Sequence, residues 1–277
     1  MKPDRLNALI NLLDDPEELV FQDVASELLK EDDSIIGHLE KIWETSLDEL
    51  VQSRLENIIQ QIQIRHTNAK IKDWANQKHI DLLEGSFLLN QYQYPRLKLK
   101  DIENKLNRIS DEVWKMTDNR MTPVEKITVL NHILFNKHRF RVRPVFFQPE
   151  NCYINYLLDT KEGTPVSFSI LYILISRKLD FSIQYIDFPK TPVLVYIDPK
   201  INAPLFYIHP SNKGAIIGRK ELDFFLKRNN IINNNHLESF CEDKIIIKKL
   251  LESLIEAYSI LGNHEKVSDL RSIAANI

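Results

Sequence analysis

The stretch "EGTPVSFSILYILISRKL", residues 162–179, decides the fold. It begins with a small turn, Glu162-Gly163-Thr164-Pro165, and continues as a strongly apolar run that predicts a buried helix. Many thiol enzymes place a nucleophilic Cys at the start of such a helix, because the helix N-terminus stabilises a thiolate. Here the turn and first positions carry Thr164, Ser167 and Ser169 but no Cys. The stretch is therefore an active site with another nucleophile, a relic of one, or only a buried helix.

The residues after this helix alternate between strand-like runs and turns. Three runs, at 181–188, 192–198 and 203–210, are separated by Pro-containing turns and predict strands. The stretch 212–231 then predicts a turn, a short strand and a helix, with Gly214 supplying a positive φ in the turn. A buried helix followed by an antiparallel meander is typical of an α+β module.

The residues before the helix are helical by pattern. Leu6 to Leu13 form an apolar stripe of helical spacing, and Ser46 is the predicted cap of a helix that continues to about residue 66. "PEELVFQDV" and "LDELVQSRL" repeat at an offset of 31 residues, which suggests a short HEAT-type array. Further along, Thr122 and Glu125 form a capping-box pattern.

Apolar spacing predicts that the aromatic residues of the middle helices face the core. Trp114 is placed on the inner face of an amphipathic helix that begins near Asp101, and Trp74, Tyr92 and Tyr94 are also expected inside. At the end of the chain, Gly262-Asn263 is predicted to join two helices in a tetratricopeptide-like hairpin.

These patterns predict a mainly helical α+β protein. We expect four regions along the chain: a HEAT-like region at 1–68, a helical part of the central domain at 69–143, an α+β core at 144–228, and a helical hairpin at 229–277.

Composition excludes several classes of protein. The net charge of −3 gives no general attraction to nucleic acid, and the longest apolar stretch is too short to span a bilayer. The two cysteines, Cys152 and Cys241, form no CxxC pair, and no dinucleotide or phosphate-loop motif is present. We therefore expect a cytoplasmic protein with no cofactor, no metal, no nucleic acid and no membrane partner.

Five motifs follow one another along the chain: "DLLEGSFLLNQYQYP" (81–95), "EKITVLNHILF" (125–135), "PENCYINYLL" (149–158), "EGTPVSFSILYILISRKLDFSIQYIDFP" (162–189) and "FYIHPSNKGAIIGRKEL" (206–222). Through these motifs and their order, the chain from about residue 70 onward resembles the SirB-type proteins, which have a transglutaminase-like core.

The resemblance implies a transglutaminase/papain-like core with a Cys-His-Asp triad. In such a triad the His takes the thiol proton and the Asp fixes the His tautomer. Residue by residue, the Cys position matches Ser167, the His position matches Thr191 or Pro192, and the Asp position matches His209. None of the three usual residue types is in place, so the resemblance implies a degenerate triad at Ser167, Thr191 and His209.

Two readings of function stay open at this stage. The first is a non-catalytic scaffold or regulator whose helical flanks bind a protein or peptide partner. The second is a hydrolase or acyltransferase that uses a rearranged Ser167–His209 pair or Cys152 as a displaced nucleophile. In either case the candidate cleft is expected to include Asn151, Cys152, Thr164 and Pro192.

Overall fold

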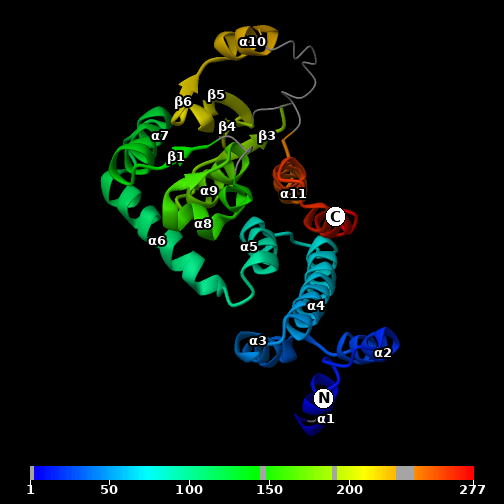
Figure 1. Ribbon diagram of the computed structural model, residues 1–277. Helices are drawn as coiled ribbons and strands as arrows, with labels where there is room; N and C mark the ends of the chain where they lie inside the picture. Colours follow the sequence, from blue (N-terminus) through cyan, green and yellow to red (C-terminus); the bar gives the residue numbers. More distant parts are fainter. Residues whose placement is uncertain (1–2, 144–147, 189–191, 229–239) are drawn as a thin grey trace. The chain divides into compact units, whose positions relative to one another are not determined.

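The computed structural model describes residues 3–143, 148–188, 192–228 and 240–277. Contacts between residues divide the chain into two compact units, Met1–Asp73 and Trp74–Ile277. The fold is mainly helical with small sheets, as the sequence predicts (Figure 1). None of the described helices combines the length and the apolar character that crossing a membrane requires.

The first unit consists of four α-helices: α1 (Pro3–Ile10), α2 (Glu18–Leu28), α3 (Ile36–Thr45) and α4 (Glu49–Ala75), with a short 3₁₀ turn η1 (Asp33–Ile35) before α3. Their apolar faces meet in one core that includes Leu13, Leu28, Leu39 and Leu55. The helices agree with the sequence pattern, while the assignment to a HEAT-like repeat stays a prediction.

Helix α4 differs from the sequence prediction at both ends. It runs without a break from Glu49 to Ala75, so the predicted boundary at residue 68 falls inside a helix, and the division between the units lies at Asp73. Its first turn is capped by Asp48 rather than Ser46, since Asp48 Oδ1 accepts from the amides of Leu50 (2.8 Å) and Val51 (3.1 Å). A carboxylate is a strong helix cap and also favours the positive end of the helix dipole.

The second unit begins with helices that surround a central helix. These are α5 (Leu82–Gln93), α6 (Leu99–Met116), α7 (Pro123–Asn131) with a π-helical turn η2 (His132–Lys137), and α8 (Ile154–Thr160), which follows the 3₁₀ turn η3 (Pro149–Cys152). Helix α9 (Pro165–Lys178) is buried from Val166 to Ser176. It is the predicted apolar helix, and Figure 1 shows it at the centre of this unit.

The four-stranded sheet is the predicted antiparallel meander. Strands β3 (Ile183–Ile186), β4 (Val193–Asp198), β5 (Ala203–His209) and β6 (Ala215–Ile217) lie in chain order. One face packs on the following helix α10 (Arg219–Arg228), and Figure 1 shows the sheet between α9 and α10. A second, small sheet pairs β1 (Arg141–Val142) with β2 (Glu162–Gly163) in parallel and was not predicted.

The chain ends in the predicted helical hairpin. Helix α11 (Asp243–Ile260) and helix α12 (His264–Ala274) are joined at Gly262, whose φ is +71°, and at Asn263, whose side chain caps α12. Tyr92 of α5 donates a hydrogen bond to Asp269 of α12 at 2.7 Å, which ties the hairpin to the core. The likeness to a tetratricopeptide unit stays a prediction.

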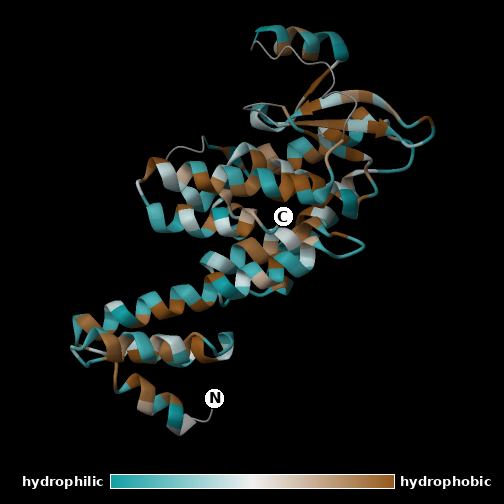
Figure 2. Ribbon diagram, turned by 90° about the vertical axis from the view of Figure 1, so that its right-hand side faces the viewer, coloured by the Kyte–Doolittle hydropathy of each residue, from teal (hydrophilic) through white to brown (hydrophobic). Residues whose placement is uncertain are grey.

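One of the aromatic residues expected in the core lies on the surface. Trp74 and Tyr92 are buried, but Trp114 is 70% exposed. The inward positions of α6 are taken by a stripe that ends at Val113, so the next residue along the helix points about 100° away from it. Figure 2 shows the resulting alternation of hydrophobic and hydrophilic residues along the helices.

Candidate functional site

The N-terminus of α9 is built by Thr164 and Pro165. Thr164 has extended backbone angles and caps the helix, because its Oγ1 accepts from the Ser167 amide at 3.3 Å. Proline at the first helical position needs no amide partner there, which favours a helix start at this residue. The sequence therefore fixes Ser167 in the first turn of α9, where the resemblance places the nucleophile.

The hydroxyl group of Ser167 is engaged inside the protein. Its Oγ donates to the backbone carbonyl of Asn151 at 2.8 Å, and the Thr164 hydroxyl donates to it at 3.2 Å. The same Asn151 carbonyl also accepts from the Thr164 amide at 3.1 Å. Only 1% of Ser167 is exposed to solvent. An oxygen that gives its proton to a backbone carbonyl and has no access to solvent is poorly placed to attack a substrate.

Gly163 makes this close packing possible. A Cβ at this position would lie 2.7 Å from Cδ1 of Leu157 and 2.8 Å from Oγ of Ser167. Both distances are shorter than packed side chains allow, so the chain needs a residue without a side chain beside Ser167.

Cys152 lies beside this helix cap, but its thiol has low reactivity. The residue is completely buried in the turn η3, and burial raises the pKa of its thiol to about 12, although a hydrogen bond with Thr164 opposes the shift. The thiolate is the reactive form of cysteine, so a raised pKa lowers reactivity. Cys152 is therefore a core residue in this structure.

We predict that Cys152 resists alkylation in the folded protein. With a pKa near 12, about a thousandth of the thiol is ionised at pH 9, against about half for an ordinary cysteine. Iodoacetamide followed by mass spectrometry should modify the half-buried Cys241 first and Cys152 only after urea is added. Equal rates at the two cysteines in the folded state would contradict the burial of Cys152.

The raised pKa of Cys152 also makes the stability of the folded protein depend on pH. A buried thiol favours the protonated form, so its contribution to stability is fully present below the pKa of the unfolded chain. The contribution is lost as the pH rises from there through the pKa of the folded protein. We therefore expect the folded state to lose stability above about pH 9 at this residue.

His209 ends strand β5, immediately before Pro210 opens the 3₁₀ turn η4 (Pro210–Asn212). The imidazole is about half-buried, and this burial lowers its pKa below the ordinary value, so the neutral ring is favoured. The turn η4 packs on α9 and β1. The fold thus places the turn that follows His209 against α9.

The remaining predicted residues are placed as follows. Asn151, Cys152 and Thr164 meet around Ser167, and Pro192, immediately before β4, is also buried. The structure thus brings three of the four predicted cleft residues together, but as packed interior. Thr191, at the matched His position, lies outside the described residues.

A clamp that the sequence did not predict holds the β5–β6 turn against the helices. Asn131, at the end of α7, donates from Nδ2 to the Gly214 carbonyl at 2.7 Å, and its Oδ1 accepts from the Tyr172 hydroxyl at 2.7 Å. Three distant parts of the chain therefore meet at one amide group. Nothing in the local sequence around Asn131 indicates this role.

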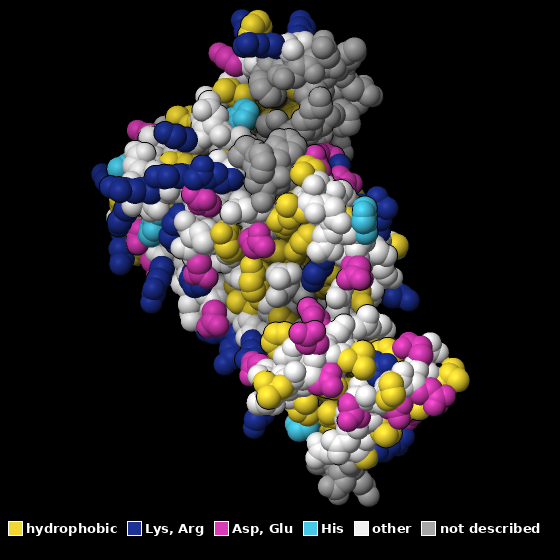
Figure 3. Space-filling view, viewed as in Figure 1, with side chains coloured by type: hydrophobic (Ala, Val, Ile, Leu, Met, Phe, Trp, Pro, Cys, Tyr) yellow, Lys and Arg dark blue, Asp and Glu magenta, His cyan; other side chains and the backbone are white. Residues whose placement is uncertain are grey.

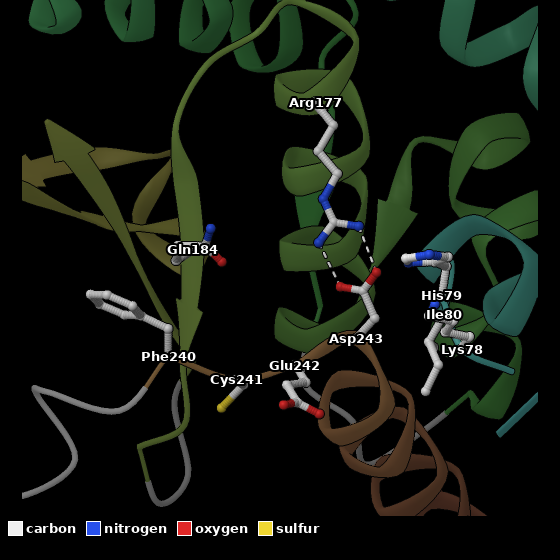
Figure 4. Close-up of a pocket in the computed structure, with 9 residues that line it drawn as sticks. All are labelled: Lys78, His79, Ile80, Arg177, Gln184, Phe240, Cys241, Glu242 and Asp243. Atoms are coloured by element: carbon white, nitrogen blue, oxygen red, sulfur yellow. Dashed lines mark hydrogen bonds and ion pairs between the residues drawn. The ribbon is translucent and has the colours of Figure 1, made fainter. Parts of the chain in front are cut away.

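A pocket of about 580 Å³ lies at the opposite end of α9 (Figure 4). Arg177, in the last turn of α9, makes two hydrogen bonds to the carboxylate of Asp243 at the start of α11, at 2.7 and 2.5 Å. The rest of the lining comes from loops and from strand β3: Lys78, His79, Ile80, Gln184, Phe240, Cys241 and Glu242. It is separate from the residues around Ser167. In the described part of the chain, no three His, Cys, Asp or Glu residues are grouped to hold a metal ion.

These features define a transglutaminase-like protein. Residues 100–255, more than half of the chain, match the profile of the Transglutaminase-like superfamily, and the chain belongs to this family. The matched range contains α9, which carries Ser167, the meander, which carries His209, and most of α11.

The similar proteins come from animals and from bacteria. Human F-box only protein 21 is 22% identical over 213 residues, which cover 67% of this chain and 33% of that protein, and the mouse protein is 21% identical over the same length. A UPF0162 protein of Vibrio cholerae is 25% identical over 148 residues, covering 53% of this chain and 54% of that protein. The chain spans about a third of the F-box only protein 21 sequences. No solved structure gives a significant match.

Proposed function

We propose that this chain is a non-catalytic, SirB-type member of the Transglutaminase-like superfamily that serves as a protein-binding scaffold or regulator. The observation that carries the proposal is the state of Ser167, which is buried and bonded to the Asn151 carbonyl at the position matched to the nucleophile.

The other two matched positions support the same proposal. A threonine hydroxyl has no proton-accepting group that works near neutral pH, so Thr191 cannot replace the triad histidine. A neutral imidazole at His209 carries no negative charge to stabilise a histidinium, so it cannot replace the triad aspartate. Loss of triad members leaves only a residual rate, orders of magnitude lower than that of the intact enzyme.

Binding is the function that such a fold keeps when its chemistry is lost. Helices precede and follow the core along the chain, and helical arrays commonly offer extended faces that bind peptides. The name F-box only protein 21 belongs to a much longer protein, so its role is not transferred to this chain.

One observation favours a second candidate, a hydrolase or acyltransferase. Burial keeps the His209 ring neutral, which is the form that accepts a proton, and the turn that follows it packs on the helix that carries Ser167. A change in the cap at Thr164 that freed the Ser167 hydroxyl would bring it closer to a serine–histidine pair.

Activity-based labelling separates the two candidates. A fluorophosphonate probe reacts with activated serines, and we expect no labelling of the folded chain above that of a Ser167→Ala variant. A matched Ser169→Ala variant controls for a general effect of losing a hydroxyl in α9. Stoichiometric labelling at Ser167 that is lost in Ser167→Ala and in His209→Gln would overturn the scaffold proposal.

A further inference from the structure

Among the described residues of the first unit, five large apolar side chains lie exposed, in two short stretches of sequence. Leu47 is fully exposed, and the others are exposed by about two-fifths to two-thirds of their surface. We call this set the corner surface: Leu12, Leu19, Trp43, Leu47 and Leu50. Leu12 lies in the α1–α2 connection and Leu19 in the first turn of α2, while the α3–α4 connection with its flanking turns carries the other three.

Hydrogen bonds hold both connections at the N-terminal end of α4. The guanidinium of Arg54 donates to the carbonyls of Leu13 (3.0 Å) and Asp15 (2.5 Å), which fixes the α1–α2 connection. The amide of Gln52 donates to the carbonyls of Trp43 (3.2 Å) and Ser46 (3.0 Å), which fixes the α3–α4 connection. The corner surface is thus supported by one rigid helix end.

The two stretches of sequence that carry the corner surface are rich in carboxylates. Residues 12–19 and 43–50 contain no Lys or Arg, but they contain seven acidic residues: Asp14, Asp15, Glu17, Glu18, Glu44, Asp48 and Glu49. Arg54 has a buried side chain whose guanidinium is held by the two carbonyls, lies 4.5 Å above the Phe21 ring and pairs with only one of these carboxylates, that of Glu18, at 3.6 Å. Lys41, exposed on α3, lies just outside the second stretch. Figure 3 shows the hydrophobic and acidic side chains side by side over this unit.

We infer that the corner surface is a docking site for a basic amphipathic helix of a partner protein. Exposed leucines and a tryptophan favour burial against an apolar helix face, while the carboxylates of the same two stretches favour Lys and Arg on the flanks of that face. The same carboxylates repel nucleic acid and anionic lipid surfaces. The inference rests on the proposed binding function and names the class of partner.

A direct binding test uses two synthetic peptides and the full chain. The first peptide places leucine and lysine at helical spacing, and the second is a shuffled peptide of equal charge. Fluorescence anisotropy should show at least about tenfold tighter binding of the first peptide, because only it offers a continuous apolar face. Equal binding of the two peptides would overturn the inference.

Variants then locate the binding site. Leu47→Ser with Leu50→Ser should weaken binding of the ordered peptide about tenfold, while the matched control Ile201→Ser, an exposed residue of the second unit, should leave it unchanged. Glu17→Gln with Glu44→Gln should reduce the dependence of binding on salt. No change with the double leucine variant would place the peptide elsewhere and overturn the inference.

Photo-crosslinking separates failure of this inference from failure of the proposed function. A benzophenone side chain at position 47 should capture partner segments that are basic and amphipathic, and the same side chain at position 201 should not. Capture only at position 201 would overturn the docking site but would still agree with the proposed function as a protein-binding scaffold. Absence of capture at 47 also overturns the docking site, and labelling of Ser167 by the fluorophosphonate probe would overturn the proposed function.

Discussion

Replacing Phe168 by Ala should lower the free energy of unfolding of the second unit by about 3–5 kcal/mol. Phe168 is completely buried in the first half of α9. Its ring stacks on Phe135 with centroids 5.5 Å apart and meets Phe140 edge to face at 5.7 Å. The substitution removes both aromatic contacts and leaves a cavity between α9, the π-helical turn and the segment before β1. Urea unfolding of the full chain, followed by near-ultraviolet circular dichroism, measures the change.

Phe224→Ala is the matched control for this prediction. The chemical change is identical, but Phe224 lies on α10 and is 68% exposed, so its removal should change the free energy of unfolding by less than about 0.5 kcal/mol. A loss at Phe168 as small as that at Phe224 would show that α9 is not the centre of the core.

The order of elements in the second unit could be predicted because its signals are local. Thr122 and Glu125 form the full capping box, in which the threonine accepts from the Glu125 amide and the glutamate accepts from the Thr122 amide. Short β-rich runs with turns between them give an antiparallel meander, since consecutive strands that are closely connected tend to pair. Capping and turn chemistry act within a few residues, so a sequence displays them directly.

Features that depend on distant contacts could not be predicted. Apolar spacing places Trp114 near the edge of the inner stripe of α6, but only packing decides whether the neighbouring residue takes the inward position. The continuous α4 spans a predicted domain boundary because no Gly or Pro interrupts residues 49–75, and similar composition on both sides conceals the division between the units.

The candidate site is a prediction from family motifs, which align Ser167 and His209 with the triad. In the structure Ser167 lies in the first turn of α9, and the turn that follows His209 packs on the same helix. Burial of Ser167 and its bond to Asn151 depend on a carbonyl 16 residues earlier in the chain. From residue type alone, Ser167 could be a nucleophile. Its burial and its hydrogen-bond partners, which the sequence does not show, argue against that role.

Replacing Gly214 by Ala should lower the free energy of unfolding by about 2–5 kcal/mol. Gly214 has a φ of +68°, in the left-handed region where a side chain is unfavourable. An added Cβ would also lie 2.6 Å from Cγ of Asn131 and even closer to its Oδ1. The collision would displace the amide that binds the Gly214 carbonyl and the Tyr172 hydroxyl, leaving buried polar groups without partners. Urea unfolding measures the total loss.

Gly262→Ala separates the two causes, because Gly262 has nearly the same φ of +71° but no atom within 4 Å of an added Cβ. The substitution should lower the free energy of unfolding by about 1–2 kcal/mol, which is the cost of an alanine at a positive φ. The difference between the two variants is then the cost of breaking the Asn131 clamp. Hydrogen exchange should confirm its location, with faster exchange around β6 and the end of β5 in Gly214→Ala and around the α11–α12 turn in Gly262→Ala. Equal losses of stability would mean that Asn131 moves aside freely, and that its hydrogen bonds add little to the packing that holds the turn after His209.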